Sequence, residues 1–371
     1  MEKFTLDHNE LKEKGERIKD SLMEIGAYKE ISYDLPETED MKTTTSTSYP
    51  IKAFEKFLGF YDNNEKIAFN PSISFNTDFS YCISSCRYLK EEGKDFVRLD
   101  GETSSTYKAK ADRALSYFKK RFNLHGSFQF NVRRFRRYEN AKGMSESSAV
   151  AAAVSLSLVE NVFPSSANKE SIASRFARLV SGSGTRACIN GLSIWLSYPG
   201  IDPDQSFAVR LKNNPMKFYY GIFPNSQNIA TDKAHETAVK SIFYGSWIMD
   251  KYDALNAAVE NNFDEGYLLK RGQKDSLSLH SVLLSGGLIV QTPESISLIR
   301  KILDFQNKNE GIYLNADTGP SIMIASTEKS LLKEFYENEG SRYLEGSFRF
   351  EGHLANEAEF KKESEEFFSG L

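Results

Sequence analysis

Residues 126–160 read GSFQFNVRRFRRYENAKGMSESSAVAAAVSLSLVE, and this stretch decides the fold class. In its first part, aromatic and β-branched residues alternate with polar ones, which predicts a β-strand. From residue 146 onward the side chains are mostly small and apolar, which predicts a buried helix because small side chains let neighbouring backbone approach closely. A strand that leads into a buried helix, among further strand-rich and helix-rich runs, indicates an α+β architecture.

The start of this helix is a candidate anion site. KGMSESSAVAAA, residues 142–153, places Ser145 and Ser147 where the helix begins. The free backbone amides and the macrodipole of a helix N-terminus favour phosphate, and serine hydroxyls add hydrogen-bond donors. The alternative interpretation is that the two serines simply cap the helix.

The preceding strand becomes cationic just before the helix. Alternation carries its apolar face, which begins at Phe128, onto Arg134 and Arg136. Guanidinium groups grip phosphate oxygens bidentately, so two arginines facing a helix N-terminus suggest a phosphate pocket. Exposure of these arginines to solvent is the alternative.

The regions on either side carry the same mixture of elements. Strands are predicted at LSIWLSY, SFAVRL, FYYGIF, GIYLNAD and SIMIAS, and helices near residues 168–180, 233–261, 291–304 and 327–339. The first 34 residues predict an amphipathic helix that lies on a larger body, with apolar residues at helical spacing: Leu11, Ile18, Leu22 and Ile25. The Thr- and Ser-rich residues 35–50 are typical of a connector or an extended edge segment.

Composition narrows the class of protein. The 371 residues contain 47 Lys and Arg against 51 Asp and Glu, and this near balance excludes a generic binder of nucleic acid or other polyanions. Three cysteines with only one close pair indicate a reducing compartment. The charged N-terminus is unlike a secretory signal, and no window approaches the roughly 18 uninterrupted apolar residues of a membrane span. We therefore expect a soluble cytoplasmic protein with no membrane partner.

Two further segments carry candidate functional residues. Arg186 lies in VSGSGTRACINGLSIW, residues 180–195, where a surface arginine in a Gly/Ser turn is the alternative. Asp317 lies in LNADTGPSIMIAS, residues 314–326, where an Asx-turn also explains an aspartate. The five histidines are dispersed without metal-ligand spacing, and neither G-x-x-x-x-G-K-[ST] nor G-x-G-x-x-G occurs. No metal and no dinucleotide cofactor is implied.

Taken in order, these segments resemble the mevalonate diphosphate decarboxylase family, within the superfamily of galactose, homoserine, mevalonate and phosphomevalonate kinases. The resemblance spans roughly residues 43 to 326 and rests on five motifs in the family's order: PIKAFEKFLGFYDNNEKIAFNPSISF, GMSESSAV, SGSGTRAxxNGxxxW, DSLSLH and ADTGPS. It implies a two-lobed small-molecule-kinase-superfamily fold with a cleft between the lobes. The expected organisation is an N-terminal extension and connector (residues 1–42), a first lobe with the anion-binding loop (43–205) and a second α+β lobe (206–371). It also implies a homodimer.

The resemblance further implies a catalytic constellation of Asp317, Lys56 and Arg186. Decarboxylation with loss of phosphate from a tertiary carbon builds positive charge at that carbon, which a nearby carboxylate stabilises. A lysine and an arginine hold the anionic groups of the substrate. Lys56 is also expected to pair with Asp317 and keep it ionised.

The small-residue loop differs from the family pattern, and the differences indicate which substrate the protein uses. Glu146 lies in the small-residue loop, and the family's late Ser-Gly is Ala149 and Val150. A carboxylate beside a triphosphate is unfavourable, and Val lacks the backbone freedom of Gly, so the loop is unsuited to ATP. A decarboxylase without a nucleotide loop is expected to receive a substrate already phosphorylated at the tertiary hydroxyl. That substrate is mevalonate 3,5-bisphosphate, converted without a cofactor into isopentenyl phosphate, carbon dioxide and phosphate.

One phosphate of this substrate is expected to contact a group of basic and hydroxyl side chains: Arg134, Arg136, Lys142, Ser145 and Ser147. Three other functions remain open at this point. They are an ATP-dependent decarboxylase of mevalonate 5-diphosphate or 5-phosphate, a mevalonate 3-kinase, and a non-catalytic binding protein that kept the anion pocket.

Overall fold

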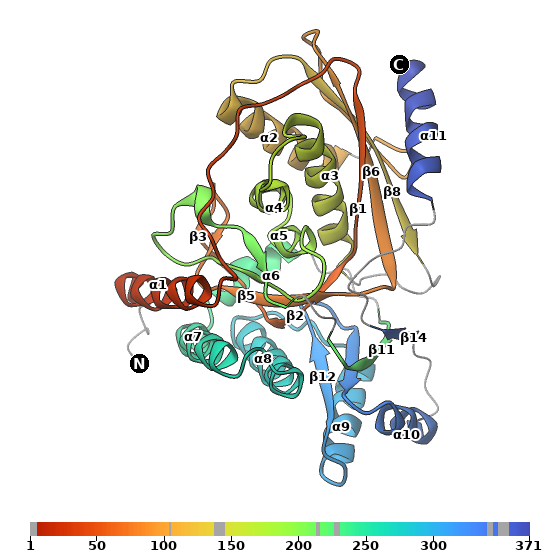
Figure 1. The fold of residues 1–371 in the computed structure, drawn as a ribbon. Helices are drawn as coiled ribbons and strands as arrows, with labels where there is room; N and C mark the ends of the chain where they lie inside the picture. The colour runs from red at the N-terminus through yellow and green to blue at the C-terminus, as the bar shows by residue number, and fades with distance from the viewer. Residues whose placement is uncertain are drawn as a thin grey trace.

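The first sheet has the order β1-β6-β8-β7 and lies between two helices (Figure 1). Its strands are β1 (Thr43–Ser48), β6 (Ser80–Leu89), β7 (Phe96–Leu99) and β8 (Ser127–Arg136), and only β7 runs parallel to its neighbour. Helix α3 (Glu146–Val162) covers one face and α11 (Glu357–Ser369) covers the other. The structure is a computed structural model that describes residues 6–103, 105–136, 145–212, 216–225, 231–339, 344–347 and 356–371.

The small side chains of α3 let this helix approach the sheet closely, as the sequence predicted. Ala151, Ala152 and Ala153 are fully buried. The hydroxyls of Ser84 on β6 and Ser157 on α3 are 2.9 Å apart and share a hydrogen bond. A helix seated this closely fixes the position of its own N-terminus beside the end of β8.

Two further sheets and a hairpin complete the strands. The second sheet, in the order β10-β9-β5-β2, contains β2 (Ile51–Glu55), β5 (Ser72–Asn76), β9 (Ser193–Trp195) and β10 (Ala208–Arg210). The third, in the order β12-β13-β11-β14, contains β11 (Tyr219–Phe223), β12 (Ile312–Ala316), β13 (Ile322–Ser326) and β14 (Leu344–Ser347). The hairpin pairs β3 (Phe60–Asp62) with β4 (Ile67–Ala68). All neighbouring strands in these sheets are antiparallel.

The remaining helices gather around these sheets (Figure 1). In chain order they are α1 (His8–Glu24), α2 (Ser105–Phe122), α4 (Lys169–Val180), α5 (Gly184–Ala187), the 3-10 turn η1 (Pro203–Gln205), α6 (Thr231–Ala238), α7 (Tyr244–Glu260), α8 (Glu265–Ser285), α9 (Pro293–Gln306) and α10 (Lys329–Glu339). Helix α4 packs on α3, α5 contacts both α3 and the second sheet, and α8, α9 and α10 pack on the third sheet. Helices and sheets are thus mixed, and the α+β prediction is confirmed.

The N-terminal helix lies on the larger body as predicted, with one difference at its end. Leu11, Ile18 and Leu22 are fully buried, but Ile25 is 52% exposed. The helix stops at Glu24 because Gly26, with φ +72°, adopts the left-handed conformation that ends helices. Ile25 therefore leaves the apolar face.

The C-terminal helix departs from the predicted lobes. Residues 206–371 were expected to form the second lobe, yet α11 packs on the first sheet. Asn131 of β8 donates to Ser364 at 2.9 Å, and the Arg98 guanidinium lies 3.5 Å from the centre of the Phe367 ring. The helix returns because the outer face of this sheet offers it polar and cationic partners. The other lobe boundaries stay a prediction.

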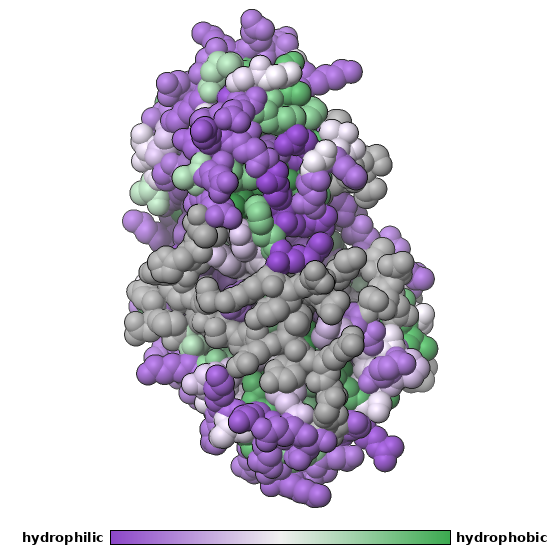
Figure 2. All heavy atoms as spheres, turned by 90° about the vertical axis from the view of Figure 1, so that its right-hand side faces the viewer, coloured by the Kyte–Doolittle hydropathy of each residue, from purple (hydrophilic) through white to green (hydrophobic). Residues whose placement is uncertain are grey.

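Two helical stretches also differ from expectation. The single helix expected over 233–261 is divided into α6 and α7, and the 21-residue helix α8 was not predicted. Within the described ranges, no helix is both long enough and apolar enough to cross a membrane. Figure 2 shows the face that carries α11, on whose upper part hydrophilic side chains predominate.

Candidate active site

Asp317 lies in the turn between β12 and β13, where its carboxylate faces β2. The ammonium group of Lys52, on β2, donates to Asp317 Oδ2 at 2.7 Å. The two side chains are 10% and 28% exposed, so the ion pair is largely shielded from water while the carboxylate remains accessible. Lys52 was not among the predicted site residues.

The prediction that Lys56 pairs with Asp317 is wrong as to the direct contact. The Lys56 ammonium donates to Ser276 Oγ at 3.1 Å and lies 3.5 Å from Asp275 Oδ2. The backbone amide of Lys56 also donates to that Asp275 carboxylate, at 2.9 Å. Asp275 therefore holds Lys56 by both its backbone and its side chain, which leaves the direct pair with Asp317 to Lys52.

The electrostatic part of that prediction agrees with the structure. Burial by itself raises the pKa of Asp317, but the charges of Lys52 and Lys56, the hydrogen bond from Lys52 and the charge of Arg186 outweigh it. The net result is a pKa below the ordinary value, so Asp317 stays ionised. The structure thus brings Asp317, Lys56 and Arg186 within electrostatic reach of one another.

Arg186 lies in the short helix α5 and is almost fully buried. One of its guanidinium nitrogens donates to Ser72 Oγ, and the group lies 5.5 Å from the centre of the Phe57 ring. Its Nε has no hydrogen-bond partner among the described residues. Burial lowers the pKa of Arg186 to about 9, against the opposing charge of Asp317. A buried cation with a free donor is suited to binding an anionic group.

His280 contacts the backbone beneath the Asp317 carboxylate. Its Nε2 lies 3.0 Å from the backbone carbonyl oxygen of Asp317 and donates to that oxygen in the tautomer that is protonated at Nε2. The Gln291 amide lies 3.0 Å from the same ring nitrogen. Burial lowers the pKa of His280 to about 4, although the bond to Asp317 opposes this shift. The neutral ring therefore acts as a positioning group at neutral pH.

The depressed pKa of His280 predicts a pH-dependent stability. Between its ordinary pKa of 6.5 and its folded value of about 4, the unfolded state binds a proton that the folded state does not. This residue is therefore expected to lower the free energy of unfolding as pH falls through that window, by about 2 to 3 kcal/mol. His280→Gln keeps a donor for the carbonyl but removes the titration. Denaturant unfolding should show the stability of the variant gaining on the wild type as pH falls, whereas a constant difference would contradict the assignment.

The predicted phosphate-binding arginines meet at the N-terminus of α3, but a carboxylate already lies between them. Arg136 donates twice to Glu146, at 2.5 and 2.8 Å. Arg134 lies 3.5 Å from the same carboxylate and donates to Asp100 at 2.7 Å. The structure therefore brings both arginines together as expected, paired with the chain's own acidic side chains.

The other predicted phosphate contacts are placed differently. Ser145 is the N-cap residue with a left-handed φ of 59°, and its side chain makes no capping bond with the described residues. Ser147 is exposed, whereas Ser148 is buried and donates to the Ser145 carbonyl at 2.6 Å. Lys142 lies outside the described residues. Simple capping by both serine side chains is thus not what the helix start shows.

Lys52 is the functional residue that the sequence reasoning missed. The signal was present, because Lys52 interrupts the apolar part of a strand in which every residue is buried. A buried lysine needs a carboxylate partner, and Asp317 is far away in sequence. The described residues contain no group of three or more His, Cys, Asp or Glu side chains that could hold a metal ion.

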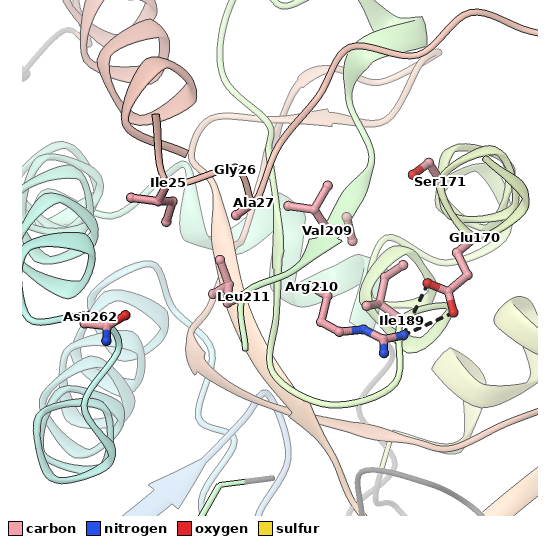
Figure 3. A pocket seen from close by; sticks show the side chains of 11 residues that line it. Ile25, Gly26, Ala27, Glu170, Ser171, Ile189, Val209, Arg210, Leu211 and Asn262 are labelled. Atoms are coloured by element: carbon pink, nitrogen blue, oxygen red, sulfur yellow. Dashed lines mark hydrogen bonds and ion pairs between the residues drawn. The ribbon is translucent and has the colours of Figure 1, made fainter. Parts of the chain in front are cut away.

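A pocket of about 370 Å³ lies away from this cluster (Figure 3). Its lining includes Ile25, Val209 and Leu211, and an ion pair of 3.2 Å joins Arg210 and Glu170 at its side. None of the predicted site residues lines this pocket. The cluster around Asp317 is therefore the candidate active site on chemical grounds.

Comparisons with known proteins define the class and then the family. The fold matches that of mevalonate diphosphate decarboxylase from Staphylococcus aureus with a TM-score of 0.74 over 84% of this chain and 97% of that one, at 19% identity. The diphosphomevalonate decarboxylase-like N-terminal domain family matches residues 48–208. The mevalonate 3,5-bisphosphate decarboxylases of Thermoplasma acidophilum and Thermoplasma volcanium are 48% and 50% identical, over 98% and 95% of this chain and 90% and 95% of their own lengths. The chain belongs to the mevalonate diphosphate decarboxylase family, and the predicted resemblance is confirmed.

Proposed function

We propose that this protein decarboxylates mevalonate 3,5-bisphosphate without ATP and releases isopentenyl phosphate, carbon dioxide and inorganic phosphate. The observation that carries the proposal is the ionised carboxylate of Asp317, set among Lys52, Lys56 and Arg186. The names of the two Thermoplasma relatives favour this reaction over a kinase or an ATP-dependent decarboxylase.

The proposed reaction needs no redox partner and no external nucleophile. The bond between the tertiary carbon and the phosphate oxygen breaks, and the electron pair leaves with phosphate. The bond to the carboxylate carbon then supplies its electron pair to the new double bond, and carbon dioxide departs. The transition state therefore carries positive charge on the tertiary carbon and negative charge on the leaving phosphate.

The residues of the cluster suit these charges. Asp317 is placed to stabilise the developing cation, because its lowered pKa keeps it ionised. Arg186, with its free Nε, and the two lysines are placed to hold the substrate's carboxylate and phosphate groups. We propose Asp317, Lys56, Arg186 and the newly found Lys52 as the catalytic group.

The position of Glu146 supports independence from ATP. At the N-terminus of α3, where a nucleotide phosphate would bind, the Glu146 carboxylate occupies the donors of Arg136 and contacts Arg134. A triphosphate would have to displace this internal anion and leave it buried beside like charge. The substrate is therefore expected to arrive with its leaving phosphate already attached.

We propose that one substrate phosphate contacts a group of basic and hydroxyl residues: Arg134, Arg136, Lys142, Ser145 and Ser147. For this contact to form, Glu146 has to release Arg134 and Arg136, because its carboxylate contacts both of them in this conformation. We also propose a homodimer, as the resemblance implied, and a location in the cytoplasm, as the cysteine content and the charged N-terminus led us to expect.

The experiment is to incubate the purified protein with mevalonate 3,5-bisphosphate, with and without ATP and magnesium, and to follow carbon dioxide and phosphate release. Equal turnover in both conditions is expected. In the same assay, Glu146→Gln removes the internal anion from Arg136 and leaves Arg134 paired with Asp100 alone, so ATP should inhibit this variant at least about tenfold more strongly than the wild type. ADP formation by the wild type from mevalonate 5-phosphate or 5-diphosphate would contradict the proposal.

A further inference from the structure

A buried lysine outside the catalytic cluster carries the inference. Lys251 of α7 has a fully buried side chain, and its ammonium group donates to Asp275 Oδ1 and lies 3.5 Å from Glu55 Oε2. Burying an ammonium group is costly unless carboxylates compensate it. A protein in which apolar side chains replace such a buried ion-paired group is often equally stable. The presence of Lys251 with its two carboxylate partners therefore calls for an explanation other than stability.

The pair formed by Lys251 and Asp275 leads directly to Lys56. Asp275 uses one carboxylate oxygen for Lys251 and for the indole N–H of Trp247, which donates at 3.1 Å. It uses the other oxygen for the Lys56 amide at 2.9 Å, and this oxygen is 3.5 Å from the Lys56 ammonium. Lys251 and Trp247 thus fix the orientation of the carboxylate that holds Lys56.

The line of contacts continues from Lys56 to the catalytic turn. Lys56 donates to Ser276 Oγ at 3.1 Å. The same oxygen accepts the backbone amide of Ala316 at 3.0 Å, and Ala316 immediately precedes Asp317. The Lys56 ammonium therefore has a fixed place relative to the catalytic carboxylate, and Asp275 sets that place.

On the side of Lys251 away from Asp275, acidic and basic side chains alternate from Glu55 to the partly exposed Asp250. Glu55 accepts from Arg271 at 2.8 Å, and Arg271 donates to Asp250 at 3.0 Å. These side chains come from β2, α7 and α8. Because opposite charges alternate, removing Lys251 alone would leave Glu55 and Asp275 as neighbouring buried carboxylates.

We propose that Lys251 is a positioning residue for the decarboxylation. It holds Asp275 in the orientation that fixes Lys56 beside Asp317. The inference rests on the proposed function, because positioning matters only for the substrate turned over at that cluster.

The test uses a charge-balanced double variant, because Lys251→Met alone leaves Glu55 and Asp275 as neighbouring buried carboxylates without the cation between them, which disfavours folding. Lys251→Met combined with Glu55→Gln removes one positive and one negative charge. We expect this double variant to fold and to lose about 10- to 100-fold in kcat with a much smaller change in KM. Lys333→Met, at an exposed site on α10, is the matched control and should retain wild-type kinetics.

A second readout needs no substrate. The 13Cε resonance of Lys56, assigned by its loss in Lys56→Arg, reports the surroundings and the pKa of its ammonium group. Burial lowers this pKa, and four charged groups modify it: Asp275, Asp317, Lys52 and Lys251. Without the like charge of Lys251, the pKa of Lys56 should rise and the resonance should move.

The two readouts separate the possible failures. Wild-type kcat in the folded double variant, or an unchanged Lys56 resonance and titration, would overturn the positioning role. If the wild type itself does not turn over mevalonate 3,5-bisphosphate, the proposed function fails. The resonance of Lys56 then still decides whether Lys251 positions it.

Discussion

Asp317→Asn is expected to lower kcat at least about 1000-fold while the affinity for mevalonate 3,5-bisphosphate changes by less than about tenfold. The substitution keeps the size of the side chain and an oxygen for the Lys52 ammonium, which lies 2.7 Å from the carboxylate. It removes the negative charge that stabilises the developing cation. Because this charge acts mainly in the transition state, the loss should fall on turnover rather than on binding.

The measurement pairs single-turnover kinetics with calorimetric binding of the same substrate. Asp304→Asn is the matched control, since Asp304 is an exposed aspartate on α9 with only a long contact to Arg300. Wild-type turnover in Asp317→Asn would rule out the catalytic role. If the wild type binds phosphorylated mevalonates without turning them over, the protein is a binding module instead.

Lys52→Met is expected to lower kcat about 100-fold and to move the acid limb of its pH profile to higher pH. Lys52 supplies the strongest of the interactions that lower the pKa of Asp317 against the effect of burial. Without Lys52 this pKa rises, so Asp317 takes up a proton at a higher pH and loses the charge that the reaction needs. The sign follows from the direction of the shift, since a carboxylate with a depressed pKa loses its ionised form as pH falls.

Lys52→Arg separates the charge of this residue from its shape. It retains a cation beside Asp317, so its acid limb should stay close to that of the wild type even if kcat falls. The check is the pH dependence of kcat for the wild type and both variants. An unshifted acid limb in Lys52→Met would mean that Lys52 contacts the substrate without tuning Asp317.

Local sequence patterns were sufficient for much of the fold. The alternation in residues 126–136 predicted β8, and the small side chains from residue 146 predicted the buried helix α3, because both features depend on near neighbours. The return of α11 was not predictable in this way. Its charged and aromatic side chains find their partners, such as Arg133 for Glu363, more than 200 positions earlier in the chain.

In the candidate site, too, the residues that a local motif identifies were predicted, whereas contacts between distant parts of the chain were not. Family motifs located Asp317 and Arg186, which lie close enough for their charges to interact. The motif assigned Lys56 as the partner of Asp317, whereas Lys52 makes the direct contact. The motif could not show this, because side-chain direction here depends on the irregular pairing between Ala53 and Glu55 and on the capture of Lys56 by Asp275. The pairing of Glu146 with two arginines was equally hidden, since it depends on how β8 and α3 meet in space.

The path of the chain between β10 and α11 has a consequence for folding. Strand β10 pairs in the second sheet, and α11 seals the outer face of the first, so the residues of the third sheet are in topological terms an insertion between the two. Both ends of the inserted segment are anchored, which reduces the conformational entropy that it gains when it unfolds. Helix α11 can reach its seat only after the residues of the third sheet have been made. The packing on the first sheet is therefore completed only after the third sheet has been made, and loss of α11 would weaken the sheet that contains the earliest strand of the chain.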